Sequence, residues 1–185
     1  AERELSPGNR DPHIWLSSKR AIVMVNIIKD ELSNLDPNNK DAYAKNAEQY
    51  IEKLTSLDKE IKDSLKNLKT KYIIVYHPAF GYFTKRYGLD YISPYNGFTP
   101  NAEPSPKKIT ELMENMKSLG MNTIYYEELI DPKVARVISE QTGAEMLLLH
   151  GAHNVSKEEL ESGVSYIDIM EENLEKLKQG LVYNE

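Results

Sequence analysis

The chain has 185 residues, enough for one well-buried domain with a long appendage but short for two full lobes. Its 40% hydrophobic and 28% charged residues are those of a soluble globular protein, and its formal net charge of −6 argues against a nucleic-acid partner, which needs a basic face. It has no cysteine, which excludes thiolate metal sites, disulfides and cysteine nucleophiles.

The N-terminal part is predicted to be a loop followed by a helix. The first ten residues are polar with a Pro-Gly step, which is typical of a loop. No apolar run approaches the roughly 18 residues of a membrane span, and the chain begins with Ala, so we expect any signal or lipid-anchor segment upstream. A helix is predicted from about Ser17, because apolar residues recur at three- and four-residue steps: Ile22, Val25, Ile28, Leu32 and Leu35.

A second, longer helix is predicted from Pro37 to about Leu68. Asp36 and Pro37 end the first helix and provide an N-cap and a first-turn proline for the next. At about 1.5 Å per residue this helix would reach roughly 45 Å, longer than a compact domain needs. Such a helix either extends from one lobe to support a further part of the protein, or lies across the surface of a single domain with one side in solvent.

From Lys71 onward, strands and helices alternate, which predicts an α/β lobe with a parallel sheet of about four strands and flanking helices. Helix-start signals occur at Ser105-Pro106, at Asp131-Pro132 and at the capping-box spacing of Ser156 and Glu159. The expected strands are 72–76, 91–92, 123–126 and 145–149, and the expected helices are 79–87, 106–119, 132–142 and 166–178.

Two histidines stand where apolar runs end. His77 follows the run that ends at Tyr76, and His150 follows the run that ends at Leu149. If both runs are neighbouring parallel strands, both imidazoles lie at the edge where open α/β sheets bind ligands. Neutral imidazole is the commonest transition-metal ligand, so the placement predicts a metal site, although His77 could equally cap the turn and His150 could equally be a solvated loop residue.

Other candidate side chains surround this predicted edge. His153 follows His150 after two small residues, so either could turn toward the edge, and His13 precedes the first helix in a possible capping turn. Three carboxylates, Glu103, Glu127 and Glu128, are expected mainly to hydrogen-bond to ligands or to cap helices. The sequence lacks the nucleophile elbow, the phosphate-binding loops and the H-E-x-x-H motif. No residue pattern indicates a general base beside a metal position, so the sequence argues against an enzyme.

Four motifs together resemble the zinc/manganese class of ABC-transporter solute-binding proteins, from about residue 11 to the C-terminus. They are Asp-Pro-His-Ile-Trp-Leu at 11–16, His-Pro-Ala-Phe-Gly-Tyr-Phe at 77–83, Arg-Tyr-Gly-Leu at 86–89 and Glu-Pro-Ser-Pro at 103–106. The resemblance implies two α/β lobes joined by a rigid long helix, with a metal held between them by four side chains. It also implies an extracytoplasmic protein, membrane-anchored in its full-length form.

The resemblance assigns His13 and His77 as metal ligands. The family's third ligand is a carboxylate just after the last strand, where this chain has His150, so either His150 or His153 is expected to replace it. The fourth is a histidine of the N-terminal lobe, and nothing in this chain matches it. Ser17-Ser18 also departs from the family's Asp-Pro.

We therefore expect a fragment in three parts. These are a remnant of the N-terminal lobe at 1–36, a linking helix at 37–70 and a Rossmann-like C-terminal lobe at 71–185. The remnant would expose Trp15, Ile22, Val25 and Ile28, so the fragment is expected to dimerise or exchange helices.

The leading hypothesis is a high-affinity metal-binding component of an ABC importer that delivers its metal to a permease. Three imidazoles favour Zn²⁺ over Mn²⁺, which prefers oxygen ligands. The alternatives are a metal-dependent hydrolase or chelatase-like enzyme, and a surface adhesin with a structural metal.

Overall fold

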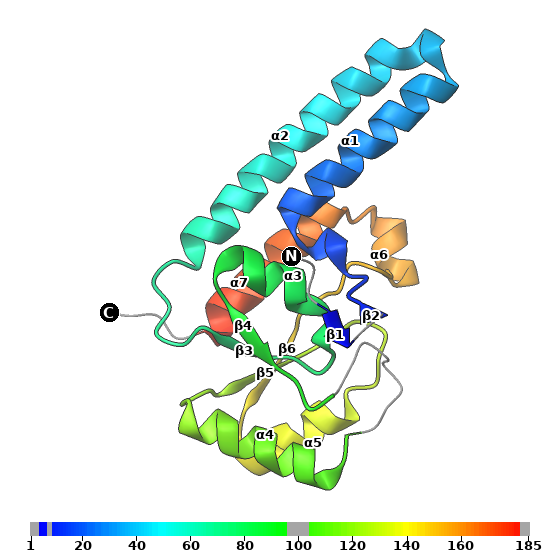
Figure 1. The fold of residues 1–185 in the computed structure, drawn as a ribbon. Helices are drawn as coiled ribbons and strands as arrows, with labels where there is room; N and C mark the ends of the chain where they lie inside the picture. Colours follow the sequence, from blue (N-terminus) through cyan, green and yellow to red (C-terminus); the bar gives the residue numbers. More distant parts are fainter. Residues whose placement is uncertain (1–3, 7–8, 96–103, 182–185) are drawn as a thin grey trace.

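The computed structural model describes residues 4–6, 9–95 and 104–181. A long helical hairpin projects from an α/β lobe (Figure 1). The segment predicted to be a loop instead contains two short antiparallel strands. The N-terminal elements are β1 (Glu4–Ser6), β2 (Asn9–Arg10), η1 (Ile14–Leu16), α1 (Ser18–Leu35), η2 (Pro37–Asn39) and α2 (Lys40–Ser64).

The lobe contains the expected alternation of strands and helices. Its strands are β3 (Tyr72–Ile74), β4 (Asp90–Ile92), β5 (Thr123–Tyr126) and β6 (Glu145–Leu148). Its helices are η3 (Pro78–Phe80), α3 (Gly81–Tyr87), α4 (Pro106–Ser118), α5 (Lys133–Thr142), α6 (Lys157–Ser162) and α7 (Tyr166–Gly180). Of these, α6 is absent from the expected helices, and only the capping-box spacing of Ser156 and Glu159 indicates its start.

The four strands form a parallel arrangement in the order β4-β3-β5-β6. β3 pairs in parallel with β4, and β5 pairs in parallel with β6. A parallel bridge between Val75 and Tyr125 joins the two pairs, and the Tyr76 N–H donates to the Tyr125 carbonyl at 3.0 Å. The predicted four-stranded parallel sheet is therefore confirmed, as two ladders linked by one bridge.

Side chains on opposite faces of this sheet enter two separate cores. Ile73 packs toward the face that carries α3, α7 and the end of α2, whereas its neighbour Ile74 packs toward α4 and α5 (Figure 1). This alternation is what successive residues of a strand must do, because they point to opposite faces. The lobe is thus a three-layer sandwich of helices, sheet and helices.

The long helix is shorter than predicted. A 3-10 turn precedes α2, which has 25 residues and is thus about 37 Å long at 1.5 Å per residue. Leu65 and Leu68 continue the apolar spacing beyond the helix end, and both are buried in the core of the lobe. They belong to the turn that leads into β3, so the helix predicted to reach Leu68 ends about one turn earlier, at Ser64.

Polar contacts attach the hairpin to the lobe. Asp58 of α2 accepts hydrogen bonds from Arg86 Nε at 2.9 Å and from the Tyr87 hydroxyl at 3.0 Å. Burial alone would raise the pKa of Asp58, but these bonds outweigh it and hold the pKa below its ordinary value. The Tyr87 hydroxyl also lies 3.1 Å from Ser18 Oγ, so one network joins α1, α2 and α3.

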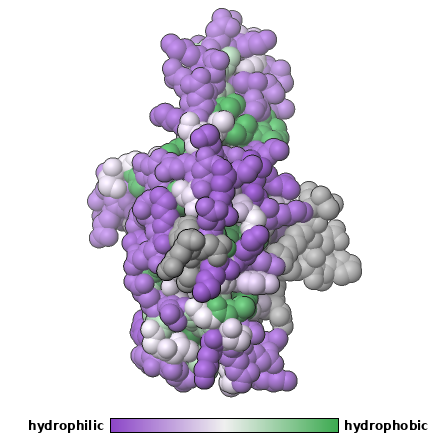
Figure 2. Space-filling model, turned by 90° about the vertical axis from the view of Figure 1, so that its left-hand side faces the viewer, coloured by the Kyte–Doolittle hydropathy of each residue, from purple (hydrophilic) through white to green (hydrophobic). Residues whose placement is uncertain are grey.

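One face of α1 exposes apolar side chains. Trp15, Ile22 and Val25 are half-buried, whereas Ile28 is 55% exposed, so the predicted exposed stripe is only partly confirmed. Hydrophobic surface is visible on the projecting hairpin among mostly hydrophilic atoms (Figure 2). The exposed apolar residues of α1 are Val23, Ile27, Ile28, Leu32 and Leu35. Among the described helices, none is long and apolar enough to cross a membrane.

Candidate metal centre

The carboxyl ends of three strands bring the candidate residues to one edge of the sheet. His77 follows β3 and the bridge residue Val75, Glu127 and Glu128 follow β5, and His150 lies two residues after β6. Because the strands are parallel, these segments leave the sheet on the same side. His13, just before η1, approaches the same edge from the base of the hairpin.

Three imidazoles form a group, called here the histidine cluster: His13, His77 and His153. The ring centroids of His13 and His77 are 5.2 Å apart, and those of His13 and His153 are 6.4 Å apart. His13 and His77 are each 6% exposed. The cluster therefore combines two buried imidazoles with the exposed His153, and its three potential metal ligands come from separate segments.

A carboxylate contacts the Nδ1 atom of each buried imidazole in the cluster. His13 Nδ1 lies 2.8 Å from Asp11 Oδ1, and His77 Nδ1 lies 3.1 and 3.3 Å from the two Glu127 oxygens. When Nδ1 donates its proton to such a carboxylate, Nε2 is the unprotonated nitrogen of the neutral ring. This arrangement orients metal-binding histidines and makes them more basic.

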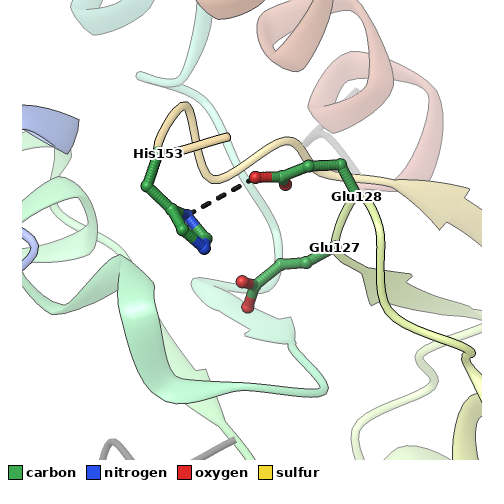
Figure 3. Close-up of side chains that lie close together, drawn as sticks. All are labelled: Glu127, Glu128 and His153. Carbon is green, nitrogen blue, oxygen red and sulfur yellow. Dashed lines mark ion pairs between the residues drawn. The ribbon is translucent and has the colours of Figure 1, made fainter. Parts of the chain in front are cut away.

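The carboxylates themselves also fit a cation. One ligand atom from each of Glu127, Glu128 and His153 lies within 4.8 Å of the others (Figure 3). Glu127 and Glu128 are 4% and 8% exposed, and Glu128 Oε1 and Asp11 Oδ2 have no hydrogen-bond partner among the described residues. Because burying a carboxylate without compensation is costly, this donor set is suited to a bound metal ion.

The sequence-based roles of the carboxylates agree with their contacts. Glu127 accepts from His77, and Glu128 Oε2 accepts from the Gly151 N–H at 2.7 Å. Glu103 lies outside the described residues. Asp11 was not singled out as a carboxylate partner, although its position two residues before His13 is the signal that could have found it.

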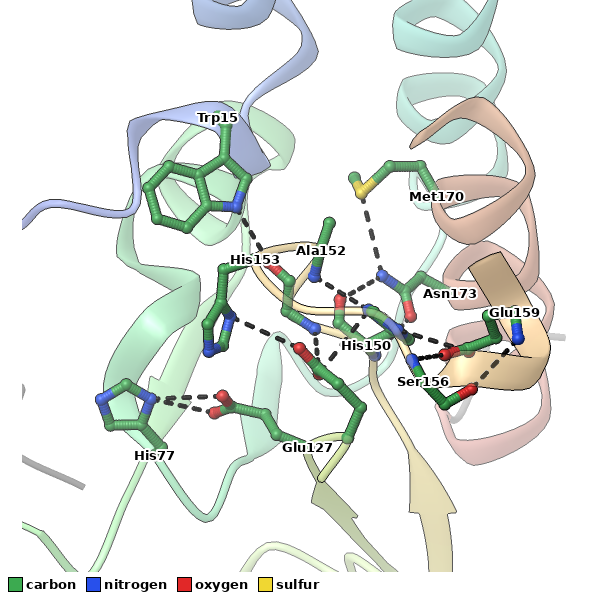
Figure 4. A network of polar contacts seen from close by, with 12 residues as sticks. Trp15, His77, Glu127, His150, Ala152, His153, Ser156, Glu159, Met170 and Asn173 are labelled. Atoms are coloured by element: carbon green, nitrogen blue, oxygen red, sulfur yellow. Dashed lines mark hydrogen bonds and ion pairs between the residues drawn. The ribbon is translucent and has the colours of Figure 1, made fainter. Parts of the chain in front are cut away.

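His150 lies close in sequence to the cluster, but its ring points elsewhere. Its Nδ1 accepts from the Ala152 N–H at 2.9 Å, and its Nε2 lies 3.5 Å from Glu159 Oε1. His153 points toward His77, whereas His150 points toward Glu159 of α6 (Figure 4). Within the described part of the chain, the structure brings His153 to His13 and does not bring His150 there.

A backbone constraint accounts for the position of the His153 ring. A Cβ atom on Gly151 would lie 2.7 Å from His153 Nδ1 and 3.4 Å from Glu127 Oε2. His153 Nδ1 in turn lies 3.4 Å from Glu128 Oε1. The absence of a side chain at Gly151 therefore lets the imidazole approach the two carboxylates.

A parallel α/β lobe with imidazoles and carboxylates at one sheet edge, entered by a long helix, defines the class of metal-binding solute-binding proteins. The chain belongs to the ZnuA family, described as zinc-uptake complex component A, periplasmic, which matches residues 1–180.

Individual relatives agree with this assignment. The chain is 40% identical over 168 residues to the zinc-binding protein AdcA of Streptococcus pyogenes (91% of this chain, 32% of that protein). It is 40% identical over 172 residues to the high-affinity zinc uptake system protein ZnuA of Bacillus subtilis (93% and 54%). The solved Zn(II)-bound ZnuA-like domain of Streptococcus pneumoniae AdcA superimposes with a TM-score of 0.80 at 39% identity (96% and 67%). The chain thus spans about a third to a half of the curated relatives' length.

Proposed function

We propose that this chain belongs to the zinc-binding component of an ABC importer, which captures Zn²⁺ outside the cell membrane and delivers it to a permease. The observation that carries the proposal is the pair His13 and His77, with rings 5.2 Å apart and each Nδ1 held by a carboxylate. The names of the relatives, which are zinc-binding and zinc-uptake proteins, support the same cargo. The periplasmic family description supports an extracytoplasmic location.

The ligands we propose are His13 and His77 through Nε2, together with His153. His150 is the alternative third ligand, but its Nδ1 already accepts a hydrogen bond and its Nε2 lies against Glu159. The position of the His153 ring, 6.4 Å from that of His13, favours His153. Three imidazoles favour Zn²⁺ over Mn²⁺, although the nearby carboxylates would also accept Mn²⁺.

The metal is a cargo in this proposal, and no catalytic role is assigned to the site. A zinc hydrolase needs a general base poised beside a metal-bound water. The Glu127 carboxylate contacts His77, and Glu128 Oε2 accepts from the Gly151 N–H. Both carboxylates therefore contact groups of the protein that they hold in position. The family is a transport component, which agrees with this interpretation.

We propose three functional parts: 1–36, which belongs with a first lobe, the linking helix at 37–70, and the metal-binding lobe at 71–185. The exposed apolar side chains of α1 would pack against that first lobe. In the isolated chain, the same face would pair with a second copy, because exposed apolar surface of this kind favours association.

A zinc titration of variants tests the proposal. The chain is stripped of metal with a chelator, and zinc affinity is measured by competition with a zinc-binding dye. One bound zinc per chain is expected, and His77→Ala should lose nearly all binding, because it removes a buried ligand. Lys69→Ala serves as a control on an exposed residue of the linking part, away from the proposed ligands. Wild-type affinity in the His77→Ala protein would contradict the proposed site.

A further inference from the structure

The loop of residues 150–153, between β6 and α6, is held from several directions. The Gly151 N–H donates to Glu128 Oε2 at 2.7 Å. The Gly151 carbonyl accepts from Trp15 Nε1 at 2.9 Å, which ties the loop to the base of the hairpin. The Ala152 N–H donates to His150 Nδ1 at 2.9 Å. Three consecutive groups of the backbone are therefore bound by side chains.

Asn173 of α7 fixes the backbone at the start of this loop. It is 2% exposed, its Oδ1 accepts from the His150 N–H at 2.7 Å, and its Nδ2 donates to the His150 carbonyl at 2.8 Å. Both backbone groups of His150 are thus bound to one buried side chain (Figure 4). With its backbone fixed in this way, His150 directs its ring onto its own loop.

The backbone at Ala152 needs such support. Its φ is +53°, in the left-handed region that residues with a Cβ rarely occupy. The bond from the Ala152 N–H to the side chain two residues earlier has the connectivity of an Asx turn, with an imidazole nitrogen in place of the Asn oxygen. The turn stabilises this conformation, and the next residue is His153.

Resting on the zinc function proposed above, we propose that His150 is a positioning residue. Its Nδ1 holds Ala152 in the left-handed conformation that turns His153 toward His13 and His77. Because Nδ1 accepts a hydrogen bond, the neutral ring carries its proton on Nε2, which lies 3.5 Å from Glu159 Oε1. Nδ1 also lies 3.6 Å from Glu128 Oε2, while Nε2 faces α6, and in this proposal His150 acts on the metal by positioning His153.

Two substitutions at position 150 separate the effect of the hydrogen-bond acceptor from the effect of the side-chain volume. Asn at position 150 keeps an acceptor for the Ala152 N–H through its Oδ1, whereas Leu fills the space without one. His150→Asn should bind zinc like the wild type, and His150→Leu should bind at least about tenfold more weakly, because a ligand has lost its support. The zinc competition titration described above measures both.

Trp15 supplies a second measurement that needs no metal. It is the only tryptophan of the chain, and its indole N–H donates to the Gly151 carbonyl. In the metal-free protein, His150→Leu should therefore shift the Trp15 fluorescence emission, whereas His150→Asn should leave it unchanged. If the wild type bound no zinc, the proposed function would fail, while the Trp15 emission would still decide whether His150 positions the loop.

The same two variants can also contradict the proposal. Wild-type affinity and emission in His150→Leu would overturn the proposal, and so would an equal loss in His150→Asn, because the acceptor would then not be the cause. Circular dichroism checks that each variant is folded. His150→Ala, which lacks the acceptor without adding bulk, takes the place of His150→Leu if the latter does not fold.

Discussion

Replacing Glu127 by Gln should weaken zinc binding while the protein stays folded. The Glu127 oxygens lie 3.1 and 3.3 Å from His77 Nδ1, and both side chains are buried. Loss of a carboxylate that orients a metal-binding histidine commonly costs about 10- to 100-fold in affinity. That loss corresponds to about 1.4 to 2.7 kcal/mol at 25 °C.

The assay compares zinc affinity with stability. Glu127→Gln keeps the shape of the side chain but removes a buried charge, so the melting temperature of the metal-free protein should not fall as the affinity does. Glu140→Gln makes the same chemical change on the exposed side of α5 and should alter neither quantity. A fall in melting temperature with unchanged affinity would mean that Glu127 supports the fold rather than the site.

The tautomer of His77 gives the most direct check of the mechanism. Nitrogen-15 NMR of the metal-free wild type should show His77 protonated at Nδ1 with Nε2 unprotonated, because Nδ1 faces the carboxylate. In Glu127→Gln the ring should populate both tautomers. A wild-type ring protonated on Nε2, or wild-type zinc affinity in Glu127→Gln, would show that Glu127 does not orient His77 for the metal.

Further outcomes follow from other contacts. Zinc affinity should fall as the pH is lowered, because protons compete with the metal for the imidazole nitrogens, and titrations over a pH series measure it. Gly151→Ala should weaken zinc binding by displacing His153, whereas Gly120→Ala, with open space but a φ of +64°, should lower only the melting temperature. Asp58→Asn should cost about 1 kcal/mol of unfolding free energy at pH 7. Because the folded pKa of Asp58 is lowered, its contribution is present above the ordinary carboxyl pKa and is lost as pH falls through the folded pKa, so the deficit in urea unfolding should shrink near pH 3. Ile27→Glu should shift any dimer to monomer in light scattering, and an unchanged dimer would place the interface elsewhere.

Much of the fold could be predicted because its elements carry strong local signals. The helix expected at 17–35 is observed at Ser18–Leu35, and Asp36-Pro37 marks its end. The strand expected at 123–126 has those bounds in the structure. In contrast, α6 has six residues, too few for a repeating apolar face, so only its capping box could indicate it.

The sheet edge of the site could be predicted, but the choice between two histidines could not. His77 at the end of an apolar run indicates the edge because parallel strands end together. Which of His150 and His153 turns toward His77 depends on the left-handed φ of Ala152 and on bonds from Asn173, 23 residues beyond His150. Such contacts between segments distant in sequence leave no local pattern. The sequence therefore does not decide whether His150 or His153 is the third ligand.

A zinc-loaded crystal, measured on both sides of the zinc absorption edge, would locate the bound metal among these histidines. We predict one anomalous peak bonded to Nε2 of His13 and of His77 at about 2.0 to 2.1 Å, with His153 as a further ligand. A peak bonded to His150 instead, or a peak remote from His77, would contradict the account.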